Sequence, residues 1–119
     1  MGITLLSVLV ANPGDVRRTA EVECLVDSGA IYAAIPRRIL RSLGIVPSRT
    51  QRFTLADGTH IQRDIGSAVV RIGRRHGASP VIFGERGDAA LIGAVTLESL
   101  GLMLDPLRRE LRAMRLLMM

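Results

Sequence analysis

The tetrapeptide Asp27-Ser28-Gly29-Ala30 is the place where residue types and context together indicate chemistry. Leu25 and Val26 precede it, at the end of a segment whose alternating pattern predicts a half-buried strand. The carboxylate is followed by a hydroxyl and two small residues, which let another chain approach the backbone closely. Asp, Ser and Gly are also the commonest turn residues, so the tetrapeptide taken alone fits a plain turn.

A second apolar motif, Ala90-Leu91-Ile92-Gly93, follows after a predicted helix and a predicted hairpin, and leads into another helix. With this pair of motifs the sequence resembles the retropepsin-like aspartic proteases. The likeness is to their small bacterial relatives in particular, which carry a hairpin of the Ala-Asp-Gly kind. The resemblance covers residues 21–105, most of the chain.

The resemblance implies an all-β fold with two short helices, built as a closed barrel lobe with one lobe in each chain. It assigns Asp27 as the catalytic carboxylate. It implies that the Ser28 hydroxyl donates a hydrogen bond across a dimer, that Gly29 presents its carbonyl to substrate, and that Ala30 lines the adjoining pocket.

The hairpin residues Ala56, Asp57 and Gly58 correspond to the flap that closes over substrate, although an ordinary surface turn has the same sequence pattern. Further residues are implied as subsite or second-motif positions, and each is also what a core would use: Ile35, Leu91, Ile92 and Gly93, with Ile31 and Leu55 as additional apolar candidates. Two features depart from the viral enzymes. The flap has a single glycine and an acidic tip, and Gly93 is followed by Ala94 instead of a bracing arginine.

Hydrolysis by this route needs two carboxylates that share a water, and the sequence carries one such motif. The expected active unit is therefore a twofold homodimer in which two copies of Asp27 meet on the axis. We expect an aspartic endopeptidase that acts on peptide or protein substrates. The alternative is a dimeric peptide-binding module of the same fold without useful turnover.

The composition limits the number of domains, the kinds of partner and cofactor, and the location that we expect for this protein. The chain of 119 residues fits one domain spanning residues 1–119, and its three aromatic residues require an aliphatic core. Its 16 basic residues are all arginine and are scattered, so a nucleic-acid partner is not expected despite the net charge of +5. Cys24 fits a buried apolar position, and His60 and His76 are isolated, so neither a metal nor a cofactor is expected. Without a signal pattern or membrane span, a cytoplasmic location is expected.

Turn residues and apolar periodicity predict short strands and two helices. The expected strands are Ile3–Val10, Arg18–Val26, Ile31–Ile35, Arg49–Leu55, Thr59–Asp64, Ala68–Ile72, Pro80–Phe83 and Ala89–Ile92, with helices at Pro36–Leu43 and after a capping Thr96. The end of the chain fits two forms. One is a hairpin from Leu102–Leu104 to Glu110–Leu116, and the other is a helix over Leu107–Met118.

Overall fold

The computed structural model describes residues 4–114. Within that span, strands and two six-residue helices follow one another in this order: β1 (Leu5–Asn12), β2 (Asp15–Val26), β3 (Ala33–Pro36), α1 (Arg37–Ser42), β4 (Arg49–Thr54), β5 (His60–Ile72), β6 (Arg75–Gly84), β7 (Leu91–Ile92), α2 (Ala94–Ser99), β8 (Leu102–Asp105) and β9 (Glu110–Ala113). The expected mostly-β fold with two short helices is confirmed.

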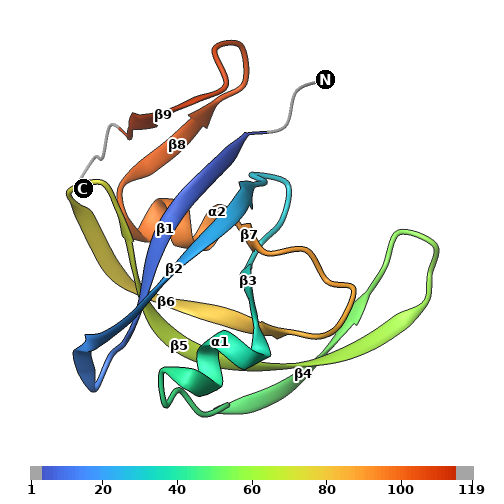
Figure 1. Ribbon diagram of the computed structural model, residues 1–119. Coiled ribbons are helices and arrows are strands. Elements are labelled where there is room, and N and C mark those ends of the chain that lie inside the picture. Colours follow the sequence, from blue (N-terminus) through green and yellow to red (C-terminus); the bar gives the residue numbers. More distant parts are fainter. Residues whose placement is uncertain (1–3, 115–119) are drawn as a thin grey trace, which may run out of the picture.

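The main sheet closes on itself. Its strand order is β1-β2-β7-β3-β6-β5-β4, and β1 also pairs with β5. Strand β1 closes the sheet because it pairs with β2 on one side and with β5 on the other. Val10 lies at this point, opposite both Ala20 of β2 and Val70 of β5. In Figure 1 the β4–β5 hairpin extends from this closed lobe to the right, and β8 and β9 form a separate small sheet at the top.

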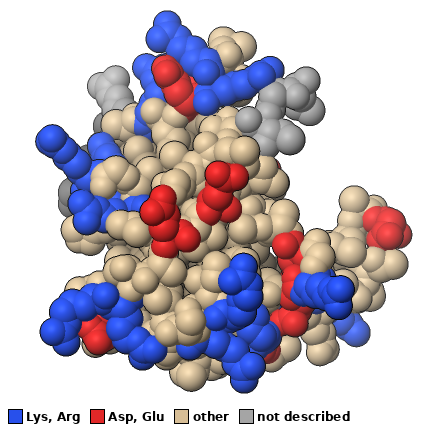
Figure 2. Space-filling view, viewed as in Figure 1, with Lys and Arg blue, Asp and Glu red and all other residues tan. Residues whose placement is uncertain are grey.

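Charged side chains cover the outside of the lobe without forming one continuous basic stripe on the face shown. Figure 2 shows the arginines of that face in separate groups, with acidic residues between them. Several arginines in residues 4–114 form ion pairs: Arg17, Arg37, Arg63 and Arg112. These four are therefore at least partly neutralised within the chain.

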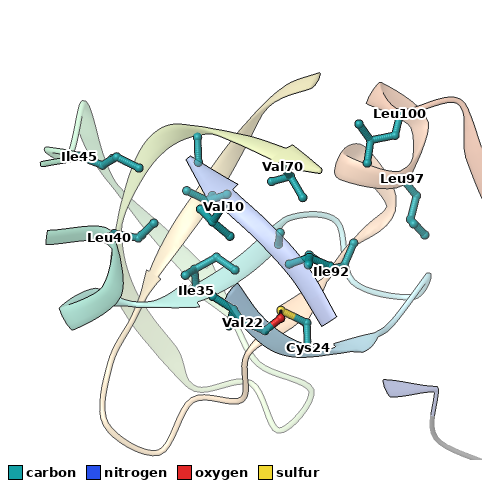
Figure 3. Close-up of a cluster of buried hydrophobic side chains, with 14 of the residues drawn as sticks. Val10, Val22, Cys24, Ile35, Leu40, Ile45, Val70, Ile92, Leu97 and Leu100 are labelled. Atoms are coloured by element: carbon teal, nitrogen blue, oxygen red, sulfur yellow. Dashed lines mark hydrogen bonds between the residues drawn. The ribbon is translucent and has the colours of Figure 1, made fainter. Parts of the chain in front are cut away.

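The core is aliphatic, as the composition requires. Side chains from β1, β2, β3, α1, β5, β7 and α2 point into one interior (Figure 3), and Phe83 is the aromatic residue among the fully buried ones. The alternation predicted for β2 is confirmed, since Val22, Cys24 and Val26 are all buried. Burial of apolar surface at roughly 25 cal/mol per Å² is the main stabilising contribution here.

Strands β5 and β6 are longer than the sequence pattern predicts. Thr59–Asp64 and Ala68–Ile72 were expected as separate strands, but β5 runs without interruption through Gly66. A Cβ at Gly66 would lie 2.8 Å from a Phe83 ring carbon, so this glycine admits a close core contact and does not break the strand. The segment between the expected strands Ala68–Ile72 and Pro80–Phe83 is mostly strand as well, because β6 already begins at Arg75. The turn is Gly73-Arg74, with Gly73 at a φ of 61°.

The second predicted helix begins earlier than expected and has a different cap. Helix α2 starts at Ala94 with Gly93 as its N-cap, so the prediction that Thr96 caps it is wrong. Thr96 is instead fully buried, and its hydroxyl lies 2.7 Å from the Ser79 hydroxyl, a pair that only the tertiary fold brings together. Strand β7 is also shorter than the expected Ala89–Ile92, and its Leu91 is half-buried.

The first helix and the C-terminal hairpin agree more closely with expectation. Pro36 ends β3 and is the N-cap of α1, and Gly44, at a φ of 78°, follows its end. Strands β8 and β9 pair from Leu102–Ala113 to Asp105–Glu110, which confirms the hairpin and excludes the helical alternative up to residue 114. Residues 115–119 of both alternatives lie outside the described span. None of the helices between residues 4 and 114 has the length and apolar character needed to cross a membrane.

Cys24 provides a test of the core. Its side chain is fully buried, and burial, helped by the charge of Glu23, raises the pKa of the thiol to about 11. Because the thiolate is the reactive form, the native protein should not react with Ellman's reagent at pH 8 over minutes. After unfolding in guanidinium chloride, the single cysteine should react fully. Rapid stoichiometric labelling of the native protein would contradict this burial.

Candidate active site

The loop of residues 27–32 joins two strands that do not pair with each other. Strand β7 lies between them, parallel to β2 through Val26 and Ile92 and antiparallel to β3 through Ala34 and Leu91. The Asp27 N–H donates to the Ile92 carbonyl at 2.9 Å, so the β2–β7 ladder continues up to the carboxylate-bearing residue. The two sequence motifs are therefore adjacent in space, and Asp27 lies where this pair of strands ends.

Hydrogen bonds fix the loop from two sides. Internally, the Asp27 carbonyl accepts the Ala30 N–H at 3.1 Å, and Asp27 Oδ1 accepts the Gly29 N–H at 2.9 Å. From outside, the Ala94 and Val95 N–H groups of α2 donate to the loop carbonyls of Ala30 and Ile31 at 2.8 and 3.0 Å. N–H groups in the first turn of a helix have no partner within the helix. The loop carbonyls therefore supply hydrogen-bond partners for these N–H groups of α2, and the same two bonds fix the position of the loop.

Gly93 allows this close approach. A Cβ at this position would lie 2.7 Å from the Tyr32 carbonyl oxygen and 2.9 Å from the Ala30 carbonyl oxygen. Both contacts are with backbone, which cannot rotate away as a side chain can. The glycine of the second motif is thus required by the packing of the first.

The Asp27 carboxylate is exposed, and within residues 4–114 the other aspartates are bonded elsewhere. Within residues 4–114 its one hydrogen bond is the bond from Gly29. The other five aspartates each bond elsewhere: Asp15 to Arg17, Asp57 to Thr59, Asp64 to Arg37 and Thr50, Asp88 to Arg63, and Asp105 to Arg112 and the N–H groups of Leu107 and Arg108. Each of these five aspartates thus has its own partner, and none of them is bonded to Asp27.

The remaining expected site residues fall into two groups. Ser28 and Gly29 are exposed beside Asp27, and Ala30 and Leu91 line one cavity. Ile35 and Ile92 differ from the expectation, because both side chains are fully buried in the core and leave no surface for a substrate. Their outward neighbours Ala34 and Leu91 line the cavity instead, since successive side chains of a strand point to opposite faces.

The predicted hairpin is present at the expected place. Strands β4 and β5 continue into a tip where the Leu55 N–H donates to the Thr59 carbonyl at 2.8 Å, and Gly58 has a φ of 87°. Asp57 Oδ1 accepts bonds from the Thr59 hydroxyl and N–H, and these bonds lower the pKa of Asp57. The tip is exposed, as is His60, whose Nδ1 lies 3.0 Å from the Thr54 hydroxyl. Whether the tip covers a substrate stays a prediction.

An arginine that sequence reasoning did not single out fixes the base of this hairpin. Arg37 of α1 donates to Asp64 of β5 at 2.6 Å and to Glu85 at 2.7 Å, and its guanidinium lies 5.1 Å from the centre of the Phe83 ring. Asp64 also accepts the Thr50 hydroxyl at 2.7 Å, and the Thr50 and Arg37 bonds lower the pKa of Asp64. The network therefore contributes its full stability at pH values above the ordinary pKa of an aspartate. This contribution is lost as the pH falls through the lowered pKa of Asp64.

A second ion pair holds the segment that leads into β7. Arg63 of β5 donates to both carboxylate oxygens of Asp88, at 2.7 and 3.0 Å, and lowers the pKa of Asp88. Asp88 also accepts the Glu85 N–H. Nothing in the sequence pattern marks these partners, because they lie far apart along the chain.

The described part of the chain offers no cluster of three or more His, Cys, Asp or Glu side chains that could hold a metal ion. The chemistry available at this site is that of an exposed carboxylate on a rigid loop, beside an apolar cavity and a projecting hairpin.

No protein-family model and no curated protein sequence matches the chain.

Among solved structures, the solution structure of the simian foamy virus (mac) protease matches with a TM-score of 0.56 over 80% of this chain and 92% of that one. The fold is that of a retropepsin-like protease lobe. The sequence identity is 18%, so the likeness shows the fold and leaves the activity to be argued from the site. The match spans most of both chains.

Gly93→Ala tests the packing of the two motifs. We expect it to destabilise the protein by about 1–3 kcal/mol, since the added methyl group must displace backbone carbonyls in a packed region. Urea unfolding of the variant and the parent measures this difference.

Gly14→Ala is the matched control, because a Cβ at Gly14 meets only the end of the Asn12 side chain, at 3.3 Å. Equal stability of the Gly93→Ala variant, the control and the parent would contradict the proposed constraint.

Proposed function

We propose that the protein is an aspartic endopeptidase whose catalytic centre forms when two copies of the chain bring their Asp27 carboxylates together. The observation that carries this proposal is the placement of Asp27. Its exposed carboxylate lies on a loop that hydrogen bonds fix from two sides, in a lobe with the retropepsin-like fold. The other five aspartates bond to other residues of the chain.

The chemistry follows from bringing two carboxylates to about 3 Å, where both cannot be ionised cheaply and one proton is shared. The ionised member takes a proton from a water held between them, and that water attacks the scissile carbonyl carbon. The protonated member donates its proton to the carbonyl oxygen, and a proton then passes to the nitrogen as the C–N bond breaks. Each carboxylate thus acts as acid and base in turn.

Ser28 and the hairpin tip have supporting roles in this proposal. The Ser28 hydroxyl is exposed at the same loop, where it can donate a hydrogen bond to the partner's loop and keep the two carboxylates level. The tip at Ala56, Asp57 and Gly58 covers the substrate and excludes water from the reacting groups. The proposal also keeps the likeness to the small bacterial relatives and a cytoplasmic location, which rest on the sequence alone.

Asp27→Asn tests the catalytic role. The amide is nearly isosteric but cannot serve as the base, so cleavage of a mixed peptide library should fall by about 10²–10⁴-fold. Circular dichroism and the sedimentation coefficient should stay as in the parent. Asp15→Asn, at the start of β2 and bonded to Arg17, is the matched control and should keep full activity.

If the parent cleaves no peptide under any condition from acid to neutral pH but still binds peptides as a dimer, the alternative of an idle peptide-binding module replaces the enzyme. Cleavage that survives in Asp27→Asn would remove Asp27 from the mechanism.

Dilution tests the shared centre. Turnover per chain should fall as the total concentration drops below the dimer dissociation constant, because a single chain supplies half of the carboxylate pair. Activity and sedimentation measured over the same concentration range should give the same midpoint. Constant turnover by a sedimenting monomer would contradict a centre made from two chains.

A further inference from the structure

A hollow of about 650 Å³ lies at the surface, at the ends of two neighbouring parallel strands. Strands β3 and β6 pair in parallel up to Pro36 and Gly84, so the segments that follow them leave the sheet side by side. After β3 the chain enters α1, and after β6 it enters the connection to β7. These two segments form the walls of the hollow, whose lining is Pro36, Arg37, Arg38, Arg41, Gly84, Glu85 and Arg86.

The lining of this hollow is strongly basic. It contains four arginines and one glutamate, which give it a formal charge of +3 at neutral pH. Arg38 and Arg41 are three positions apart on α1, a spacing that puts two side chains on the same side of a helix. Arg86 comes from the other wall. Figure 2 shows basic side chains gathered over the part of this face where α1 lies in Figure 1.

Within residues 4–114, three of these four arginines have no partner for their charge. Arg37 donates to two carboxylates, one of which is the Glu85 carboxylate of the lining. The side chains of Arg38, Arg41 and Arg86 take part in no ion pair and no side-chain hydrogen bond of that span, and all three are exposed. Like charges around one hollow repel each other, and an anion bound between them removes that repulsion.

Guanidinium groups favour a particular kind of anion. Each one presents a planar set of N–H donors that matches two oxygens of a carboxylate or a phosphate. A carboxylate has one charge and two oxygens, which are too few for three such groups. A phosphate group has three acceptor oxygens and nearly two charges at neutral pH, so it suits this lining better.

The size and composition of the hollow indicate a small ligand. Its volume lies within the range of small-molecule pockets, roughly 300–1000 Å³. None of the residues in the lining is aromatic, so the bases of a nucleic acid have no ring on which to stack. The lining therefore recognises the charged group of a ligand.

We propose that this hollow binds a small phosphate-bearing anion through the guanidinium groups of Arg38, Arg41 and Arg86. Arg37 joins the two walls, because it extends from α1 and donates to Glu85 at 2.7 Å. The inference goes beyond the proposed function, since none of these residues belongs to the proposed catalytic centre and the test requires no cleavage.

Calorimetry on the full chain at low ionic strength tests the site with three probes: pyrophosphate, phosphoserine and free glutamate. We expect one molecule of either phosphate compound to bind to each chain. Glutamate should bind about tenfold more weakly than phosphoserine, because its side-chain carboxylate can engage fewer guanidinium groups. Both phosphate compounds should also raise the Tm, since a ligand that binds the native state stabilises it.

Arginine variants locate the site. Arg38→Gln, Arg41→Gln and Arg86→Gln should each weaken the binding of pyrophosphate by about five- to tenfold, as expected for the loss of one hydrogen bond to a charged group. All three side chains are exposed, so the variants should keep the fold. Arg74→Gln is the matched control, because it removes the same charge from the exposed turn between β5 and β6, outside the hollow. Its dissociation constant should stay within twofold of that of the parent.

The two phosphate compounds distinguish the possible sources of the ligand. Tighter binding of pyrophosphate supports the site and identifies an inorganic or diphosphate group, whereas equal or tighter binding of phosphoserine supports it and identifies an organic phosphomonoester. The absence of saturable binding at millimolar concentrations would overturn the site. Equal weakening in Arg74→Gln and in the three hollow variants would also overturn it, because such a result reports only attraction by net charge.

Discussion

The placement of Asp27 depends on one packing constraint, the insertion of β7 between β2 and β3. Three backbone segments meet there, and Gly93 lies against the carbonyls of Ala30 and Tyr32 with no space for a side chain. The same close approach lets the first N–H groups of α2 reach the loop carbonyls. A short turn that would otherwise move freely becomes a rigid support for an exposed carboxylate.

The base of the β4–β5 hairpin is fixed by ion pairs, as the Asp27 loop is fixed by hydrogen bonds. Arg37 joins α1 to β5 and to Glu85, and Arg63 joins β5 to Asp88. These side chains are only partly exposed, so their charges are screened less than those of fully exposed pairs. The hairpin thus has a fixed base and an exposed tip, which is the arrangement a moving cover requires.

The sequence was most informative where local chemistry decides the structure. Asp57-Gly58 predicted the hairpin because glycine readily adopts the positive φ found there, and the alternation from Ala20 to Val26 predicted the buried face of β2. It failed where tertiary contacts decide. Gly66 lies between two strands that were expected to be separate, but it makes a close core contact within the single strand β5. Thr96 was expected to cap a helix, but it is a buried partner of Ser79. At the site, Ile35 and Ile92 have the composition of a subsite, but strand alternation turns them inward and leaves Ala34 and Leu91 at the cavity.

The central claim, that two chains share one catalytic centre, is tested most directly by mixing. The parent and Asp27→Asn are unfolded and refolded together in varying proportions at a constant total concentration well above the dimer dissociation constant. If both carboxylates are needed, activity falls as the square of the parental fraction, because mixed dimers carry one carboxylate and are inactive. Activity that falls in simple proportion to the parental fraction would show that each chain works alone, and it would contradict the account.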